Sequence, residues 1–73
     1  MARKSKHVES WSVIVGNIGT VHNGYYEKTA VDHFNYYVED SRRGFGRAGN
    51  ERVVLFRDGE IVIEYNPTTG QLT

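Results

Sequence analysis

The sequence predicts an α+β domain in which two β-hairpins form a four-stranded antiparallel sheet and one helix packs on one face, in the order ββαββ. Three observations predict this fold. Apolar residues alternate around a glycine turn in residues 11–22. Residues 27–43 contain neither glycine nor proline and carry an apolar stripe with helical spacing. Residues 52–65 hold two apolar segments around an Asp-Gly pair, which is a strong local signal for a hairpin.

The first predicted hairpin begins with Trp11, Val13 and Val15, which alternate with the residues between them as in a strand. Gly16 and Asn17 then predict a two-residue type II′ turn, because glycine at the first turn position accepts the positive φ that this turn needs. The strand pairs that this turn implies are Val15 with Ile18, Val13 with Thr20, and Trp11 with His22.

The predicted helix has an apolar stripe that would face the sheet, made of Ala30, Phe34, Tyr37, Val38 and Ser41. An acidic residue lies near its start, and arginines lie at its end, as the helix dipole favours. Glycine at position 44 follows the last turn, where a left-handed residue commonly ends a helix. The helix is therefore expected to span residues 27–43.

The second predicted hairpin turns at Asp58 and Gly59, which favour a type I′ turn. The face expected to pack on the helix pairs Phe56 with Ile61 and Val54 with Ile63, and places Arg52 beside Tyr65. The opposite face pairs Arg57 with Glu60, Leu55 with Val62, and Val53 with Glu64.

One helix covers only one face of such a sheet, so the other face is expected to be an apolar interface. The residues predicted for this oligomer interface are Ile14, Val21, Val53, Leu55 and Val62. Two further observations favour a homo-oligomer. A chain of 73 residues builds one small core, and no cysteine is present to form a disulfide or a zinc site that would stabilise it.

Three segments divide the chain by composition. Residues 1–7 form a flexible basic arm, residues 8–66 a single α+β domain, and residues 67–73 a polar tail. No segment is apolar enough to span a membrane, and no apolar stretch follows the arm as in a signal peptide. The 9 basic and 9 acidic residues give a formal net charge of zero, which does not favour nucleic acid as the partner.

The segment best suited to bind a ligand is residues 41–49, where Arg42, Arg43 and Arg47 surround a Gly-Phe-Gly sequence. Its glycines match G-x-G-x-x-G, but a dinucleotide site needs them after a strand and before a helix, and here the order is reversed. Arginine side chains bind phosphate, glycine-rich backbone exposes amides to anions, and Phe45 can stack on a base. The alternative interpretation gives the arginines to helix capping and to solvent.

The sequence thus predicts a site for a small phosphorylated, nucleotide-like ligand. Its predicted residues are Arg42, Arg43, Gly44, Phe45, Gly46, Arg47, Tyr25 and Tyr36, where the tyrosines offer a stacking face and a polar tip. His22 and His33 are too far apart in the pattern to indicate a metal pair. No catalytic Ser-His-Asp or Cys-His set is present, so we expect no enzyme, no cofactor and no metal.

Three strings of residues resemble a family of short, uncharacterised proteins of tailed phages and related mobile elements. They are VIVGNIGTV at residues 13–21, GFGRA at 44–48 and VLFRDGEI at 54–61, and the resemblance extends from Trp11 to about Tyr65. The resemblance implies a phage-encoded protein made in the bacterial cytoplasm and transfers no catalytic residue. Small phage proteins of unknown role are often accessory factors, which modify the host or block its defence systems by binding a protein or capturing a nucleotide signal.

Three functions follow as hypotheses. The first is a non-enzymatic, homo-oligomeric counter-defence protein that sequesters a nucleotide-derived signal at the arginine segment. The second is an interaction module that binds and inhibits a host protein through the open sheet face. The third is weak nucleic-acid binding through the arm and the glycine-rich loop, which predicts an affinity that falls steeply with salt.

Overall fold

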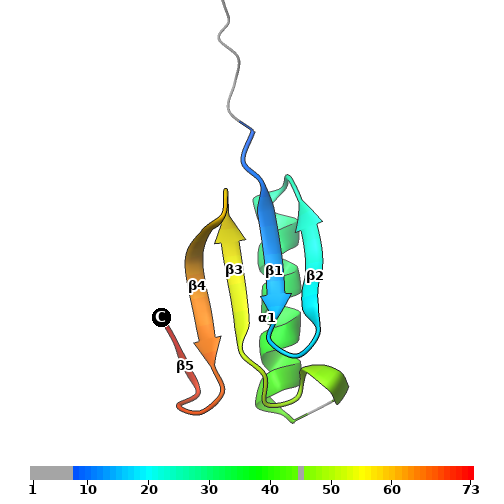
Figure 1. The fold of residues 1–73 in the computed structure, drawn as a ribbon, viewed down its shortest axis with the longest axis vertical. Helices are drawn as coiled ribbons and strands as arrows, with labels where there is room; N and C mark the ends of the chain where they lie inside the picture. The colour runs from blue at the N-terminus through cyan, green and yellow to red at the C-terminus, as the bar shows by residue number, and fades with distance from the viewer. Residues whose placement is uncertain (1–7, 45) are drawn as a thin grey trace, which may run out of the picture.

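Five strands and one long helix make up the part of the chain that the computed structural model describes, residues 8–44 and 46–73. The strands form one antiparallel sheet in the order β2-β1-β3-β4-β5, and α1 lies across one face of it (Figure 1). The elements are β1 (Trp11–Val15), β2 (Gly19–Gly24), α1 (Glu27–Arg42), a 3₁₀ turn η1 (Gly46–Ala48), β3 (Val53–Arg57), β4 (Glu60–Asn66) and β5 (Gln71–Leu72). The α+β class and the helix on one face are confirmed, but the sheet has five strands instead of four.

The first hairpin has a longer turn than the sequence predicted. Gly19 pairs with Val15 and has a φ of +102°, so residues 16–18 form the loop and the predicted two-residue turn is wrong. A bulge in β2 then leaves Val21 without a direct partner, and Val13 faces His22 instead of Thr20. This register brings His22 to the helix side of the sheet, because Val13 is buried there.

The second hairpin has the predicted turn but a different register beyond it. Asp58 and Gly59 have φ of 52° and 82°, as a type I′ turn requires, and Phe56 pairs with Ile61 as predicted. A bulge at Val62 then shifts the pairing by one residue. The pairs after the bulge are Leu55 with Ile63, Val54 with Glu64, and Val53 with Tyr65.

This shift corrects the predicted oligomer interface. Val53 and Leu55 are 0% and 3% exposed and belong to the core under α1, so their predicted position on the uncovered face is wrong. Val21 packs against the same core from the bulge in β2. The physical reason is that one extra residue in a strand reverses which side chains of its partner share a face with it. Of the predicted set, Ile14 lies on the uncovered face and Val62 is exposed.

The core lies between α1 and the first, third and fourth strands. The helix buries Ala30, Phe34, Val38 and Ser41, as the apolar stripe predicted, and Tyr37 is partly buried against the core. The sheet contributes Trp11, Val13, Val15, Val53, Leu55 and Tyr65. The helix ends one residue earlier than predicted, at Arg42, and Gly44 has the expected left-handed φ of +65°.

The expected polar tail after residue 66 instead forms a turn and the fifth strand. The Asn66 side-chain oxygen accepts from the Thr68 amide at 2.9 Å, and the Asn66 carbonyl accepts from the Gly70 amide at 2.7 Å. Thr73 and Glu64 then exchange two backbone hydrogen bonds of 2.9 and 3.0 Å. The tail is polar because it lies at a sheet edge, and its backbone bonds hold it there.

The helix leaves the opposite face of the sheet uncovered within the described residues (Figure 1). Ile14, Val54 and Phe56 lie on this face, because Val13, Val15, Val53 and Leu55 beside them point to α1, and Ile61 lies there because it pairs with Phe56. The predicted packing of Val54, Phe56 and Ile61 on the helix is therefore wrong. We call Ile14, Val54, Phe56 and Ile61, with the adjacent exposed bulge residue Val62, the open face. No helix among residues 8–44 and 46–73 is long and apolar enough to cross a membrane.

Candidate functional site

The predicted arginine site lies at the C-terminal end of α1. Arg42 is the last helical residue, and its guanidinium carbon lies 5.7 Å from the centroid of the Tyr65 ring, within range of a cation–π contact. Arg43 caps the helix and Arg47 lies exposed in η1. Phe45 lies outside the described residues. Arg42 thus contributes to packing against β4.

The backbone amides of this segment are used to end the helix. The amides of Arg43 and Gly44 donate to the carbonyls of Glu39 and Ser41 at 3.0 and 3.1 Å, and the amide of Asn50 also donates to Ser41 at 3.0 Å. Gly49 closes η1 with a bond of 3.2 Å to Gly46. Because these four amides already have partners, they are not available to a phosphate.

Neither predicted tyrosine joins the arginine segment. Tyr25 precedes the helix and is 66% exposed, and the 16 residues of α1 place it roughly 24 Å along the axis from Arg42. Tyr36 is 61% exposed near the middle of the helix and lines a pocket that contains none of the arginines. The structure therefore divides the predicted ligand residues among three places.

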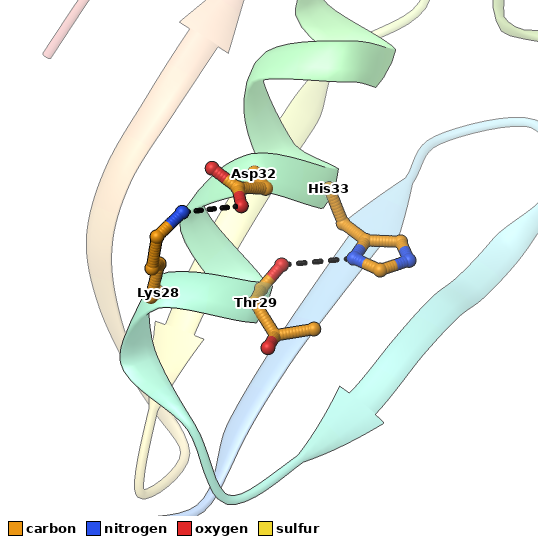
Figure 2. Close-up of polar contacts among 4 residues, drawn as sticks. All are labelled: Lys28, Thr29, Asp32 and His33. Atoms are coloured by element: carbon orange, nitrogen blue, oxygen red, sulfur yellow. Dashed lines mark hydrogen bonds and ion pairs between the residues drawn. The ribbon is translucent and has the colours of Figure 1, made fainter.

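The structure brings together two histidines that the sequence analysis kept apart. The rings of His22 in β2 and His33 in α1 stack with centroids 4.2 Å apart and an interplanar angle of 17°. His33 Nδ1 lies 2.8 Å from the Thr29 carbonyl oxygen (Figure 2). A carbonyl only accepts, so His33 Nδ1 donates and carries the proton, and in the neutral ring Nε2 is an acceptor.

This contact stayed hidden in the sequence because it depends on the bulge at Val21. In a regular hairpin, His22 would take the position opposite Trp11 that the two-residue turn implied. Only the bulged register pairs His22 with Val13, beside the first half of the helix. The position of His33 next to the buried Phe34 was the available signal, since it places the imidazole at the border of the helix stripe.

Burial lowers the pKa of His22 below its usual value, and the neighbouring His33 lowers this pKa further, because a second positive charge beside a first is unfavourable. Its Nε2 atom is buried and has no hydrogen-bond partner among the described residues. Both conditions favour a neutral His22 near neutral pH.

A pocket of about 350 Å³ lies beside the histidine pair, along the helix. Its lining is Asp32, His33, Tyr36 and Tyr37. The two tyrosine rings meet edge to face, with centroids 5.1 Å apart and planes at 90°. An Asp32 carboxylate oxygen lies 3.1 Å from Lys28 Nζ in an exposed ion pair (Figure 2). The lining thus combines two aromatic side chains with a carboxylate and an imidazole.

The open face is a separate candidate on the other side of the sheet. Ile14 pairs with Val54, and Phe56 pairs with Ile61, so apolar pairs join β1 to β3 and β3 to β4 on this face, although Val54 itself is only 9% exposed. Ile61 and Val62 are 57% and 46% exposed. The flanking positions are polar, and an ion pair of 2.7 Å joins Arg52 to Glu64.

The described residues contain no group of three or more His, Cys, Asp or Glu side chains that could hold a metal ion. Comparison with models of protein families, with curated proteins and with solved structures found no match to this chain. Geometry and chemistry alone therefore bear on function.

Proposed function

We propose that the protein is a non-enzymatic interaction module that packs the open face of its sheet against a protein partner. The observation that carries this proposal is the set of apolar side chains on three adjacent strands that α1 leaves uncovered, of which Ile61 and Val62 are the most exposed. Monomeric proteins rarely leave such patches without a binding role. The strip has a polar border, as protein interfaces commonly do.

Apolar burial supplies the driving force of this proposed contact. Complete burial of a large aliphatic side chain stabilises by about 1.5–3 kcal/mol, so covering the exposed half of Ile61 is worth roughly 1 kcal/mol. Val62 adds a similar amount. The partly exposed ion pair between Arg52 and Glu64 contributes less, because solvent screens charges near the surface. The contact should therefore resist salt.

A second copy of the chain is the first candidate for this partner. Two such sheets pack face to face about 10 Å apart, and their inner side chains form a shared core. A domain of 73 residues buries a smaller fraction of its surface than a large domain does, so burial of this face adds proportionally more to its stability. The alternative partner is a host protein in the bacterial cytoplasm, which the resemblance to phage proteins suggests.

Capture of a nucleotide-derived signal at the arginine segment is the competing proposal, and it makes a different prediction. It depends on the side chain of Arg47, since Arg42 contacts Tyr65 and the amides that end the helix have partners. It requires Arg47→Ala to abolish binding of linear or cyclic nucleotides. The open-face proposal requires no effect of Arg47→Ala on association.

Sedimentation equilibrium tests the open-face proposal. We expect the wild type to associate with increasing concentration and Ile61→Asp to remain monomeric, because a carboxylate in an apolar interface loses its hydration. Leu72→Asp is the matched control. Leu72 is 48% exposed, similar to Ile61, but it pairs with Tyr65, whose side chain lies on the α1 side of the sheet.

Two results would contradict the proposal. One is association that Ile61→Asp and Leu72→Asp weaken equally, which would place the interface elsewhere. The other combines two findings. The wild type is monomeric at every concentration, and in producing cells a photo-crosslinker at position 61 captures no more protein than a photo-crosslinker at position 72. A monomer that crosslinks from position 61 alone would identify the partner as a different protein.

A further inference from the structure

The pocket between Asp32 and Tyr37 has the chemistry of a site for a positively charged group. Tyr36 and Tyr37 lie edge to face at 90°, so two aromatic rings of different orientation line the same space. The face of a tyrosine ring attracts a cation through its quadrupole. A cation bound over such rings also contacts apolar surface, whereas binding of an anion is unfavourable there.

Two polar groups of the lining can accept hydrogen bonds from a cation. Asp32 supplies a carboxylate. His33 donates from Nδ1 to the Thr29 carbonyl, so in the neutral ring Nε2 keeps a lone pair. A lining of aromatic faces, a carboxylate and a neutral imidazole matches the N–H donors of an ammonium or guanidinium group.

The chain itself places a cation beside Asp32, a residue of the pocket lining. Lys28 Nζ lies 3.1 Å from an Asp32 carboxylate oxygen, although both side chains are largely exposed, at 88% and 62% (Figure 2). Such an ion pair between residues four apart on a helix is weak. Lys28 therefore shows that Asp32 accepts an ammonium group, and it would compete only modestly with a ligand.

We propose that this pocket binds an alkylammonium group, as carried by a lysine side chain of a partner. The pocket, of about 350 Å³, is open to solvent along the helix, so a butyl chain with a terminal amine can approach its lining from outside. The site lies on the α1 side of the molecule, away from the open face, and its occupation does not depend on association of the sheets.

NMR titration of the intact chain tests the proposal, with n-butylammonium and N-acetyl-lysine methylamide as probes and n-butanol as the neutral control. We expect saturable shifts of the ring protons of His33, Tyr36 and Tyr37 with both amines and weaker shifts with n-butanol. Saturation by the free amine alone would exclude a lysine side chain as the natural ligand. Equal shifts with amine and alcohol would overturn the proposal, since charge would then play no part.

Three variants and a control localise the site. Tyr36→Leu and Asp32→Asn should each weaken amine binding roughly two- to fivefold, because each removes one attraction for the charge. Lys28→Gln should strengthen binding up to about twofold by removing the internal competitor. Tyr26→Leu is the control, since this 74% exposed tyrosine is not part of the lining. Binding that Tyr26→Leu weakens as much as Tyr36→Leu would contradict the assignment.

Discussion

His22 is a partly buried histidine whose environment differs from that of an imidazole on the surface. It is stacked on His33, its Nε2 atom has no partner among the described residues, and its pKa is lowered by burial and by the neighbouring imidazole. In the unfolded chain the same imidazole is hydrated and isolated, so it binds a proton more readily. The free energy of unfolding therefore depends on pH through the protonation of His22.

The sign of this coupling gives a prediction. Because the folded pKa lies below the unfolded value of 6.5, the unfolded state binds more protons as the pH falls through 6.5. The free energy of unfolding should thus decrease from pH 7.5 to pH 5. Urea denaturation should show a smaller decrease for His22→Gln, which does not titrate. An equal decrease in both proteins would mean that His22 is not responsible.

At the scale of elements, Ser41 joins the end of α1 to the segment that leads into β3. Its side chain is fully buried, and its hydroxyl donates to the Glu51 carbonyl at 2.6 Å. Its own carbonyl accepts from the amides of Gly44 and Asn50. One residue therefore ends the helix and fixes the start of the returning chain, which explains why a polar side chain lies in the apolar stripe.

Removal of this hydroxyl tests the role of Ser41. Ser41→Ala leaves the Glu51 carbonyl without its donor, and we expect the free energy of unfolding to fall by about 1–2 kcal/mol. Ser12→Ala is a suitable control, because Ser12 has no such side-chain bond among the described residues, and its effect should stay within about 0.5 kcal/mol. Chemical denaturation measures both, and equal effects would show that the bond contributes nothing.

At the scale of the whole molecule, the sheet has one covered and one open side, and this asymmetry separates the two proposed binding surfaces. The core and the amine pocket lie on the side of α1, and the apolar strip lies on the other. A partner on the open face would give the sheet a second apolar layer, as in a β-sandwich. Association and folding should then stabilise each other.

This linkage predicts a thermal midpoint that depends on protein concentration. If two copies pack through the open face, the midpoint of the wild type should rise as concentration increases, because the associated state draws molecules from the unfolded ensemble. The midpoint of Ile61→Asp should stay constant over the same range. Calorimetry at several concentrations measures this, and a constant midpoint for the wild type would exclude coupled self-association.

The sequence by itself determined the structural features that depend only on residues close to one another along the chain. The apolar stripe of Ala30, Phe34 and Val38 defined the helix and its buried side, because helical spacing fixes which side chains share a face. The Asp58-Gly59 pair defined a hairpin, because few other residues accept two successive positive φ angles. The arginines were placed at the helix end for the same local reason.

Only the tertiary structure decided which residues meet across the sheet. The bulges at Val21 and Val62 each shift a strand by one residue, which moved Val53 and Leu55 into the core and brought His22 onto His33. A bulge is stabilised by packing on both faces of the sheet at once, and an isolated hairpin sequence does not contain that information. The candidate sites therefore emerged from pairing and packing, while the elements that carry them followed from local pattern.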